Sequence, residues 1–263
     1  MPEYKFEERP GGIWAPKSVD IQLGEQSGGV EQPVRLPKVV VGVAYHDGHQ
    51  LNWWTENSIR KLLLDDGKLF ESYRMDAIGY ITDDARNDIA RVAMEKDYDF
   101  VFYADSDMTF PEHTIARMIA KCADVPDDET PVIAGLYNSR KDYRIHAYKW
   151  TPEKKQFRSI HGKYDEDFKL NNGLYPVDAA GTGCMLLDCA VFNRLEWPWF
   201  YYKYEYNTDI GKRQRWSEDI VFCHRLMEAG IKVYLDTDIV AGHIQPFVVK
   251  QVDENNYNIE ELS

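Results

Sequence analysis

Two aspartates directly follow a short apolar stretch near the middle of the chain, where residues 100–107 read FVFYADSD. Alternate side chains of a strand lie on the same face, so Asp105 and Asp107 are expected to point together at the end of a strand. Neighbouring carboxylates repel each other unless a cation lies near them, and Mg²⁺ prefers oxygen ligands of this kind. The pattern indicates a metal site, although Asp-Ser-Asp can also be a plain loop that leads into a helix at Pro111.

Strand patterns and helical patterns alternate on both sides of this stretch. Short, apolar, strand-like runs occur at residues 39–44, 70–78, 100–104 and 132–137. Apolar residues recur at helical spacing in the segments between them, which are residues 52–64, the segment capped by Thr82 and the segment opened by Pro111. This order predicts an α/β fold with a mainly parallel central sheet flanked by helices. Residues 147–150 and 156–160 indicate a smaller antiparallel portion.

The two ends of the chain differ from its centre. Residues 1–37 contain ten glycines and prolines, so no regular period persists and an extended N-terminal arm is expected. Residues 38–248 form one predicted domain, because no linker divides them. Residues 249–263 are expected to form an acidic C-terminal tail, and the aromatic segment 197–216 is expected to form a loop or lid.

Composition argues against several classes of protein. The net charge of −13 disfavours a general nucleic-acid-binding surface. No apolar run approaches the ~20 residues of a transmembrane helix, and the N-terminus lacks the apolar core of a signal peptide, so a cytoplasmic protein is expected. The four cysteines show no C-x-x-C spacing, which favours buried free thiols over disulfides or a zinc site.

Four further residues have one interpretation from their own place in the chain and a second, functional one that only the family resemblance described below implies. Ser217 is expected to cap a helix that begins with Glu218 and Asp219, which either stabilise the helix dipole or take part in catalysis. A helix N-terminus at a site would also lower the pKa of such a carboxylate. His243 follows the last predicted core strand and is either a metal ligand or a histidine at the edge of the core. Arg86 either reaches a ligand or lies solvated on the exposed face of its helix.

The order of these motifs resembles a glycosyltransferase of the GT-A fold, close to the large family-2-like group. The resemblance covers residues 38–245 and rests on Asp-Ser-Asp, on Gly-Thr-Gly at residues 181–183, on Trp-Ser-Glu-Asp at residues 216–219 and on Gly242-His243. It implies a GT-A-like, Rossmann-like domain that moves a sugar from a nucleotide-diphosphate sugar to an acceptor hydroxyl, with inversion.

The same resemblance implies roles for the acidic residues. Asp107 would bind Mn²⁺ or Mg²⁺ on the diphosphate of a UDP- or GDP-sugar, and His243 would be a further ligand. Asp105 would bind the metal through water or contact the ribose. Asp219 would be the base that deprotonates a saccharide or another hydroxyl-bearing acceptor, and Glu218 would be next in line or position that acceptor.

The resemblance also implies a binding surface for the donor. Its nucleotide would lie against residues after the first strand and on the neighbouring elements, namely Ala44, Tyr45, Asp47, Asp76 and Arg86. Three small residues would lie beneath the donor sugar and the acceptor, namely Gly181, Thr182 and Gly183.

The sequence departs from the family pattern at one element. The usual acceptor-side Q-x-x-R-W is only hinted at by Gln214-Arg215-Trp216, so the acceptor stays open. A sugar-phosphate nucleotidyltransferase is one alternative, but the loop after the first strand, YHDGH, has no Lys or Arg for a triphosphate. A non-catalytic nucleotide-sugar or carbohydrate-binding protein is another. A dehydrogenase is disfavoured because no G-x-G-x-x-G follows the first strand.

Overall fold

The fold is built on a seven-stranded central sheet. A computed structural model describes residues 6–9, 13–16, 35–46, 52–140, 142–207, 211–245 and 247–261. In order across the sheet, the strands are β10 (Leu174–Val177), β15 (Val233–Val240), β7 (Val132–Leu136), β12 (Cys184–Asp188), β5 (Phe100–Asp105), β3 (Lys38–His46) and β4 (Glu71–Tyr80). Strands β4, β3, β5, β7 and β15 run in one direction, while β12 and β10 run in the other. The expected mainly parallel α/β sheet is therefore confirmed.

Helices cover both faces of this sheet, which explains why its strands are continuously apolar. The helices are α1 (Trp53–Asp65), α2 (Thr82–Glu95), α3 (Thr114–Lys121), α4 (Ala190–Asn193) and α5 (Glu218–Glu228). On one face, α2 and α5 pack with Val101 and Tyr103 of β5. On the other face, α1 and α3 pack with Phe100 and Phe102. The alternation along β5 thus divides the core into two layers, and both layers hold the end of β5 in place.

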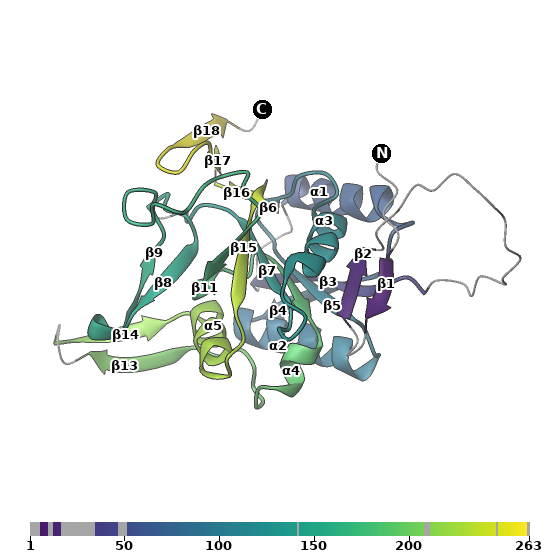
Figure 1. The fold of residues 1–263 in the computed structure, drawn as a ribbon, viewed down its shortest axis with the longest axis horizontal. Coiled ribbons are helices and arrows are strands. Elements are labelled where there is room, and N and C mark those ends of the chain that lie inside the picture. Colours follow the sequence, from purple (N-terminus) through teal and green to yellow (C-terminus); the bar gives the residue numbers. More distant parts are fainter. Residues whose placement is uncertain are drawn as a thin grey trace, which may run out of the picture.

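Smaller antiparallel sheets and two 3₁₀ turns surround the central sheet (Figure 1). They are made of β1 (Phe6–Arg9), β2 (Ile13–Pro16), β6 (Met108–Thr109), β8 (Ala147–Thr151), β9 (Gln156–Ser159), β11 (Ala179–Ala180), β13 (Lys203–Asn207), β14 (Lys212–Trp216), β16 (Gly242–Ile244), β17 (Phe247–Gln251) and β18 (Tyr257–Glu261), with turns η1 (Cys122–Asp124) and η2 (Pro152–Lys154). The hairpin β13–β14 and the strands β8 and β9 lie at the opposite end of the molecule from the hairpin β1–β2 (Figure 1).

Three segments expected to be irregular contain strands. Segment 197–216, expected to be a loop or lid, contains the hairpin β13–β14, whose residue Trp216 packs against Trp150 with ring centroids 5.9 Å apart. The expected tail, residues 249–263, contributes the end of β17 and all of β18, because β17 pairs with β16. The expected N-terminal arm contains β1 and β2, and most of its other residues lie outside the described part of the chain.

Two helix starts also differ from the prediction. Helix α2 begins at Thr82, with Ile81 in the capping position and no side-chain cap. Helix α3 begins at Thr114, whose hydroxyl donates to the Pro111 carbonyl, so Pro111 precedes the helix instead of opening it. Gly230, at a φ of 70°, follows α5. The four cysteines are buried and free, as expected, and no described helix has the length and apolar character to span a bilayer.

Candidate active site at the carboxyl ends of the parallel strands

The carboxyl ends of β3 and β5 meet at one edge of the sheet. The parallel register pairs Ala44 with Asp105, the last residue of β5. The turn between β11 and β12 approaches the same edge, where the Asp105 amide donates to the carbonyl of Gly183 at 3.2 Å. Ligands of open α/β sheets bind at this edge, so the structure brings Ala44, Asp105 and Gly183 together where the sequence predicted a site.

The guanidinium of Arg86 bridges two acids at this edge. Arg86 lies on α2, and its side chain is only 4% exposed. Nη2 donates to Oδ1 of Asp105 at 2.8 Å, and Nη1 donates to Oε1 of Glu218 at the start of α5. The interpretation of Arg86 as a solvated surface residue is therefore wrong.

Burial and charge act in opposite directions within this group. Burial alone would lower the pKa of Arg86, but the carboxylates of Asp105, Glu218 and Asp219 outweigh it and raise that pKa. Burial raises the pKa of Glu218, while Arg86 opposes the rise and Asp219 adds to it. The pKa of Glu218 is thus raised instead of lowered as expected, because the loss of water is the largest influence on it.

Asp219 is held in place by its own neighbours in the chain. Its Oδ1 accepts hydrogen bonds from the hydroxyl of Ser217 and from the amide of Ile220, the latter at 2.8 Å. Ser217 occupies the N-cap position of α5 as predicted, but its side chain makes no hydrogen bond to the helix backbone. Both hydrogen bonds that the described residues give this carboxylate go to Oδ1, so Oδ2 can accept from a ligand.

Asp107 and His243 come from distant parts of the chain and lie side by side. Strand β16 pairs with β6, so that His243 faces Met108, and the Ile244 amide donates to the Asp107 carbonyl at 2.7 Å. His243 Nε2 lies 3.5 Å from Oδ1 of Asp107, and Arg140 lies 2.7 Å from Oδ2. Burial would raise the pKa of Asp107, but His243 and Arg140 outweigh it and keep it below its ordinary value.

The donor atoms of this pair suit a divalent metal ion. His243 Nδ1 lies 2.8 Å from the carbonyl oxygen of Asn138, which can only accept, so Nδ1 carries a proton. A metal ion bound beside the Asp107 carboxylate would take the lone pair of Nε2, and the backbone carbonyl behind Nδ1 is the partner that metal-binding histidines usually have. The described residues contain no group of three His, Cys, Asp or Glu side chains placed to hold a metal ion. Asp105 instead engages Arg86.

Two glycines give the site its close packing. A Cβ atom at Gly181 would lie 2.0 Å from the Tyr137 hydroxyl and 2.1 Å from His146 Nδ1, and one at Gly183 would lie 2.8 Å from Oδ2 of Asp105. Only glycine fits at these distances. Thr182, between them, is fully buried, and its hydroxyl has no hydrogen-bond partner among the described residues.

His146 and Tyr137 are site residues that the sequence analysis missed. The Tyr137 hydroxyl accepts from the Gly183 amide at 3.2 Å, so its own proton points to His146 Nδ1, 2.9 Å away. Burial lowers the pKa of His146, although the charge of Asp219 opposes this effect. A neutral His146 that accepts from Tyr137 at Nδ1 carries its proton on Nε2. Tyr137 is the last residue of the predicted strand 132–137, and this position at a strand end could have identified it as a candidate site residue.

Tyr45 and Asp76, two further residues expected to bind the donor, form a cluster with Arg74. Tyr45 is 5% exposed, and burial, followed by the charge of Asp76, raises its pKa to about 12. Asp76 accepts from Nε of Arg74 at 2.9 Å, and Arg74 also binds Glu56 through both carboxylate oxygens. Asp47 lies outside the described residues.

Asn87, next to Arg86, fixes the chain that leads into the hairpin β13–β14. Its side-chain oxygen accepts from the amides of Trp199 and Phe200, each at 3.0 Å, and its amide donates to the Phe200 carbonyl at 2.7 Å. Arg86 thus binds Asp105 and Glu218, while the next residue, Asn87, binds the segment that leads into the hairpin.

Comparison with known proteins identifies the fold. No protein-family model matches this sequence, and no curated protein sequence matches it. A197 from STIV superposes with a TM-score of 0.54 at 15% identity, over 87% of this chain and 96% of A197. GalNAc-T7, solved with UDP, GalNAc and Mn²⁺, superposes with a TM-score of 0.51 at 15% identity, over 81% of this chain and 45% of GalNAc-T7.

At this level of identity the likeness concerns the fold, and it leaves the expected place in the family-2-like group without support. The chain spans less than half of the GalNAc-T7 chain. The central sheet, its covering helices and the shared architecture confirm the expected fold class. The chain has a GT-A-like fold.

Proposed function

We propose that this protein is a metal-dependent glycosyltransferase that moves a sugar from a UDP- or GDP-sugar to an acceptor hydroxyl. The observation that supports this most is the pairing of Asp107 with His243 at the sheet edge, because His243 Nε2 and the Asp107 carboxylate lie 3.5 Å apart, close enough to bind one ion. GalNAc-T7, which has a similar fold, was solved with UDP, GalNAc and Mn²⁺, and this also supports the proposal.

Asp107 and His243 would hold Mn²⁺ or Mg²⁺, with phosphate oxygens and water as the remaining ligands. The metal supplies a Lewis acid that offsets negative charge on the leaving diphosphate. Asp105 lies at the same edge but binds Arg86, which supports a role in contact with the ribose or through water. The acids then have separate tasks, with Asp107 binding the donor and Asp219 serving the acceptor.

Asp219 would be the catalytic base. Its Oδ1 is held by Ser217 and Ile220, so Oδ2 is left to take the proton of the acceptor hydroxyl. The acceptor oxygen forms its bond to the anomeric carbon as the bond to the diphosphate oxygen breaks, and the configuration inverts. Glu218 is already engaged by Arg86, which makes it a positioning residue.

The donor would lie across the strand ends. Gly181, Thr182 and Gly183 would pass beneath its sugar, because their small side chains let the backbone come close. Its nucleotide would extend from there toward the first strand and the α2 side, against Ala44, Tyr45, Asp47, Asp76 and Arg86. His146 would donate from Nε2 to the donor or the acceptor, since Nδ1 is occupied by Tyr137.

A panel of nucleotide sugars tests this function. Thermal unfolding is followed with UDP- and GDP-sugars, with Mn²⁺ or with a chelator. A ligand at 100 times its Kd stabilises the folded state by ~2.7 kcal/mol, so one donor class should raise the Tm only with the metal. Release of nucleoside diphosphate on addition of an acceptor then demonstrates transfer. Binding with no transfer to any acceptor would instead favour a non-catalytic binding protein, and the absence of any stabilised complex would reject the proposal.

A further inference from the structure

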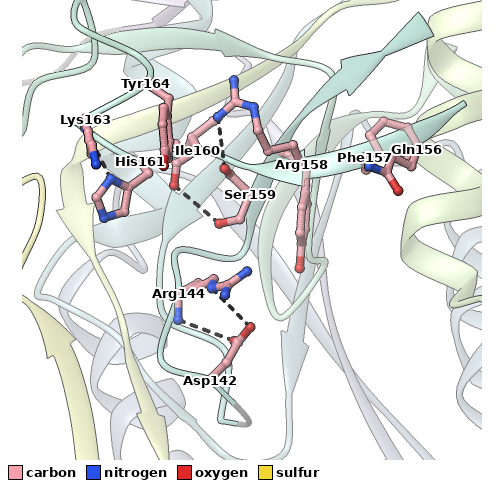
Figure 2. Close-up of a pocket in the computed structure, with 11 residues that line it drawn as sticks. Asp142, Arg144, Gln156, Phe157, Arg158, Ser159, Ile160, His161, Lys163 and Tyr164 are labelled. Atoms are coloured by element: carbon pink, nitrogen blue, oxygen red, sulfur yellow. Dashed lines mark hydrogen bonds and ion pairs between the residues drawn. The ribbon is translucent and has the colours of Figure 1, made fainter. Parts of the chain in front are cut away.

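The proposed chemistry uses the site that contains Asp105, Asp107 and Asp219, which we call the acidic site. A cavity outside the acidic site has no role in that chemistry. Its volume is about 640 Å³, within the range of small-molecule sites, and it opens beside the strands β8 and β9. Figure 2 shows Asp142 and Arg144 on one side of it and the segment that carries Arg158 and Ser159 on the other. We call this space the β8–β9 cavity.

The β8–β9 cavity adjoins the acidic site through two of its lining residues. The Tyr148 ring packs edge-on against His146, with ring centroids 5.5 Å apart. The Phe157 ring packs edge-on against Trp216, with centroids 5.7 Å apart, and Trp216 stands three positions before the proposed base Asp219. A molecule bound in the cavity would therefore contact two side chains that pack directly against His146 and Trp216.

The charge of the lining favours an anion. Arg158 is bound through both nitrogens to the buried Asp165, at 2.8 and 2.9 Å, so those two charges balance. The lining then has two further positive side chains, Arg144 and Lys163, and one negative side chain, Asp142, which lies 3.5 Å from Arg144. The described lining keeps one unbalanced positive charge, in a chain whose net charge is −13.

The remaining lining suits a sugar. Tyr148, Phe157 and Tyr164 are aromatic side chains that can pack against sugar rings, and Tyr164, which is 66% exposed, has Lys163 Nζ 5.5 Å from its ring centroid. Gln156 and Ser159 add side chains that can hydrogen-bond hydroxyl groups. Aromatic faces and hydroxyl partners together with one positive charge are the chemistry that recognises a saccharide with one negative group.

We propose that the β8–β9 cavity is the acceptor site and that its acceptor is a saccharide bearing a carboxylate, as a uronic acid does. The carboxylate would lie between Arg144 and Lys163, and the sugar to be extended would reach past Tyr148 toward Asp219. This inference rests on the proposed glycosyltransferase function, because only that function gives the cavity an acceptor to hold.

The test compares one oligosaccharide in two forms. A uronic-acid oligosaccharide and its carboxyl-reduced, neutral counterpart are titrated by calorimetry against the full chain. The acidic form is expected to bind about tenfold more tightly, the ratio that one charge-assisted contact supplies. Equal binding of the two forms, or tighter binding of a sugar phosphate of the same length, would overturn the carboxylate assignment.

Matched double variants locate the binding. R144Q/K163Q removes the two cavity cations other than Arg158, which is paired with Asp165, whereas R60Q/K68Q removes two exposed cations elsewhere, on α1 and the turn that follows it. The first is expected to lose the tenfold preference for the acidic form with the Tm unchanged, and the control to keep it. An unchanged preference in R144Q/K163Q would overturn the site.

Donor binding separates the two proposals. Nucleotide-sugar affinity in the presence of Mn²⁺ should be the same in both double variants, because the cavity lies outside the donor site. If the acidic oligosaccharide binds but no nucleotide sugar does, the glycosyltransferase function fails while the saccharide site stands. If nucleotide sugars are consumed on neutral acceptors equally by all variants, the cavity inference fails while the function stands.

Discussion

Arg86 donates a hydrogen bond from Nη2 to Oδ1 of Asp105 at 2.8 Å, although the arginine comes from α2 and the aspartate from the end of β5. The same guanidinium reaches Glu218 at the start of α5, so one buried cation joins three elements. The free energy of this group depends on all its members, because each charge is removed from water and relies on the others. The arrangement leads to the first prediction.

R86M should lower the free energy of unfolding by about 3–5 kcal/mol, the usual cost of leaving a buried charge without its partner. Urea denaturation at pH 7.5 measures the loss. The double variant R86M/E218Q should recover part of it, because the unpaired Glu218 carboxylate is then gone. Additive losses in the double variant would show that Arg86 and Glu218 are not coupled.

Asp107 and Asp219 should separate in their effects. D107A is expected to weaken the binding of Mn²⁺ and of the nucleotide sugar at least tenfold, because His243 would keep no carboxylate beside it. D219N is expected to leave both affinities unchanged and to reduce turnover alone. Calorimetry with Mn²⁺ and the donor supplies the first comparison, and steady-state kinetics the second. Equal loss of nucleotide affinity in the two variants would contradict the division of roles.

The product of the reaction should have the inverted configuration at its anomeric carbon. A single displacement with Asp219 as base places the acceptor on the face opposite the diphosphate. Loss of such a base usually costs ~10²–10⁴ in rate, which sets the expected decrease in kcat for D219N. NMR of the product anomer decides the stereochemistry, and a retained configuration would exclude Asp219 as an inverting base.

Gly181 should be intolerant of a side chain. In G181A the new methyl group would meet the Tyr137 hydroxyl at 2.0 Å and His146 Nδ1 at 2.1 Å, so their hydrogen bond must break. We expect a loss of about 1–3 kcal/mol in stability from overpacking, and a fall in activity. Y137F removes the hydroxyl without adding volume and serves as the comparison. NMR titration of His146 should show a changed pKa in both variants, and an unchanged one would refute the contact.

The ionised Asp188 carboxylate should lower the free energy of unfolding at neutral pH. It is 7% exposed, and burial raises its pKa from 3.8 to about 6. The folded state therefore binds the proton more tightly than the unfolded state does, and stability is lost as the pH rises from about 4 to about 6. D188N keeps the side-chain oxygen that accepts from the Ala190 amide at 2.8 Å.

This substitution should add up to about 3 kcal/mol at pH 7.5, at 1.36 kcal/mol for each pKa unit, and much less at pH 4.5. Thermal unfolding at the two pH values measures the difference. D65N, at an exposed position, is the control and should change little at either pH. A gain for D188N of equal size at both pH values would mean that ionisation is not its cause.

The sequence by itself determined the fold class and predicted the edge of the sheet where the candidate site lies. Apolar runs such as residues 100–104 and the helical spacing between them are local patterns, and they predicted the parallel strands and the position of Asp105 and Asp107 at a strand end. The sequence also correctly predicted that Glu218 and Asp219 begin a helix and that His243 follows the last strand of the central sheet. These features depend on residues that are near each other in sequence.

The tertiary structure alone decided which of these residues meet. Arg86 could have faced solvent, and only the packing of α2 against β5 and α5 buries it between Asp105 and Glu218. His243 reaches Asp107 because β16 pairs with β6, and the same sheet turns the expected tail into β17 and β18. Periodicity shows which face of an element is apolar, but strand register and helix packing depend on distant parts of the chain. For that reason the sequence could nominate candidate site residues, and only the fold could decide which side chains they contact.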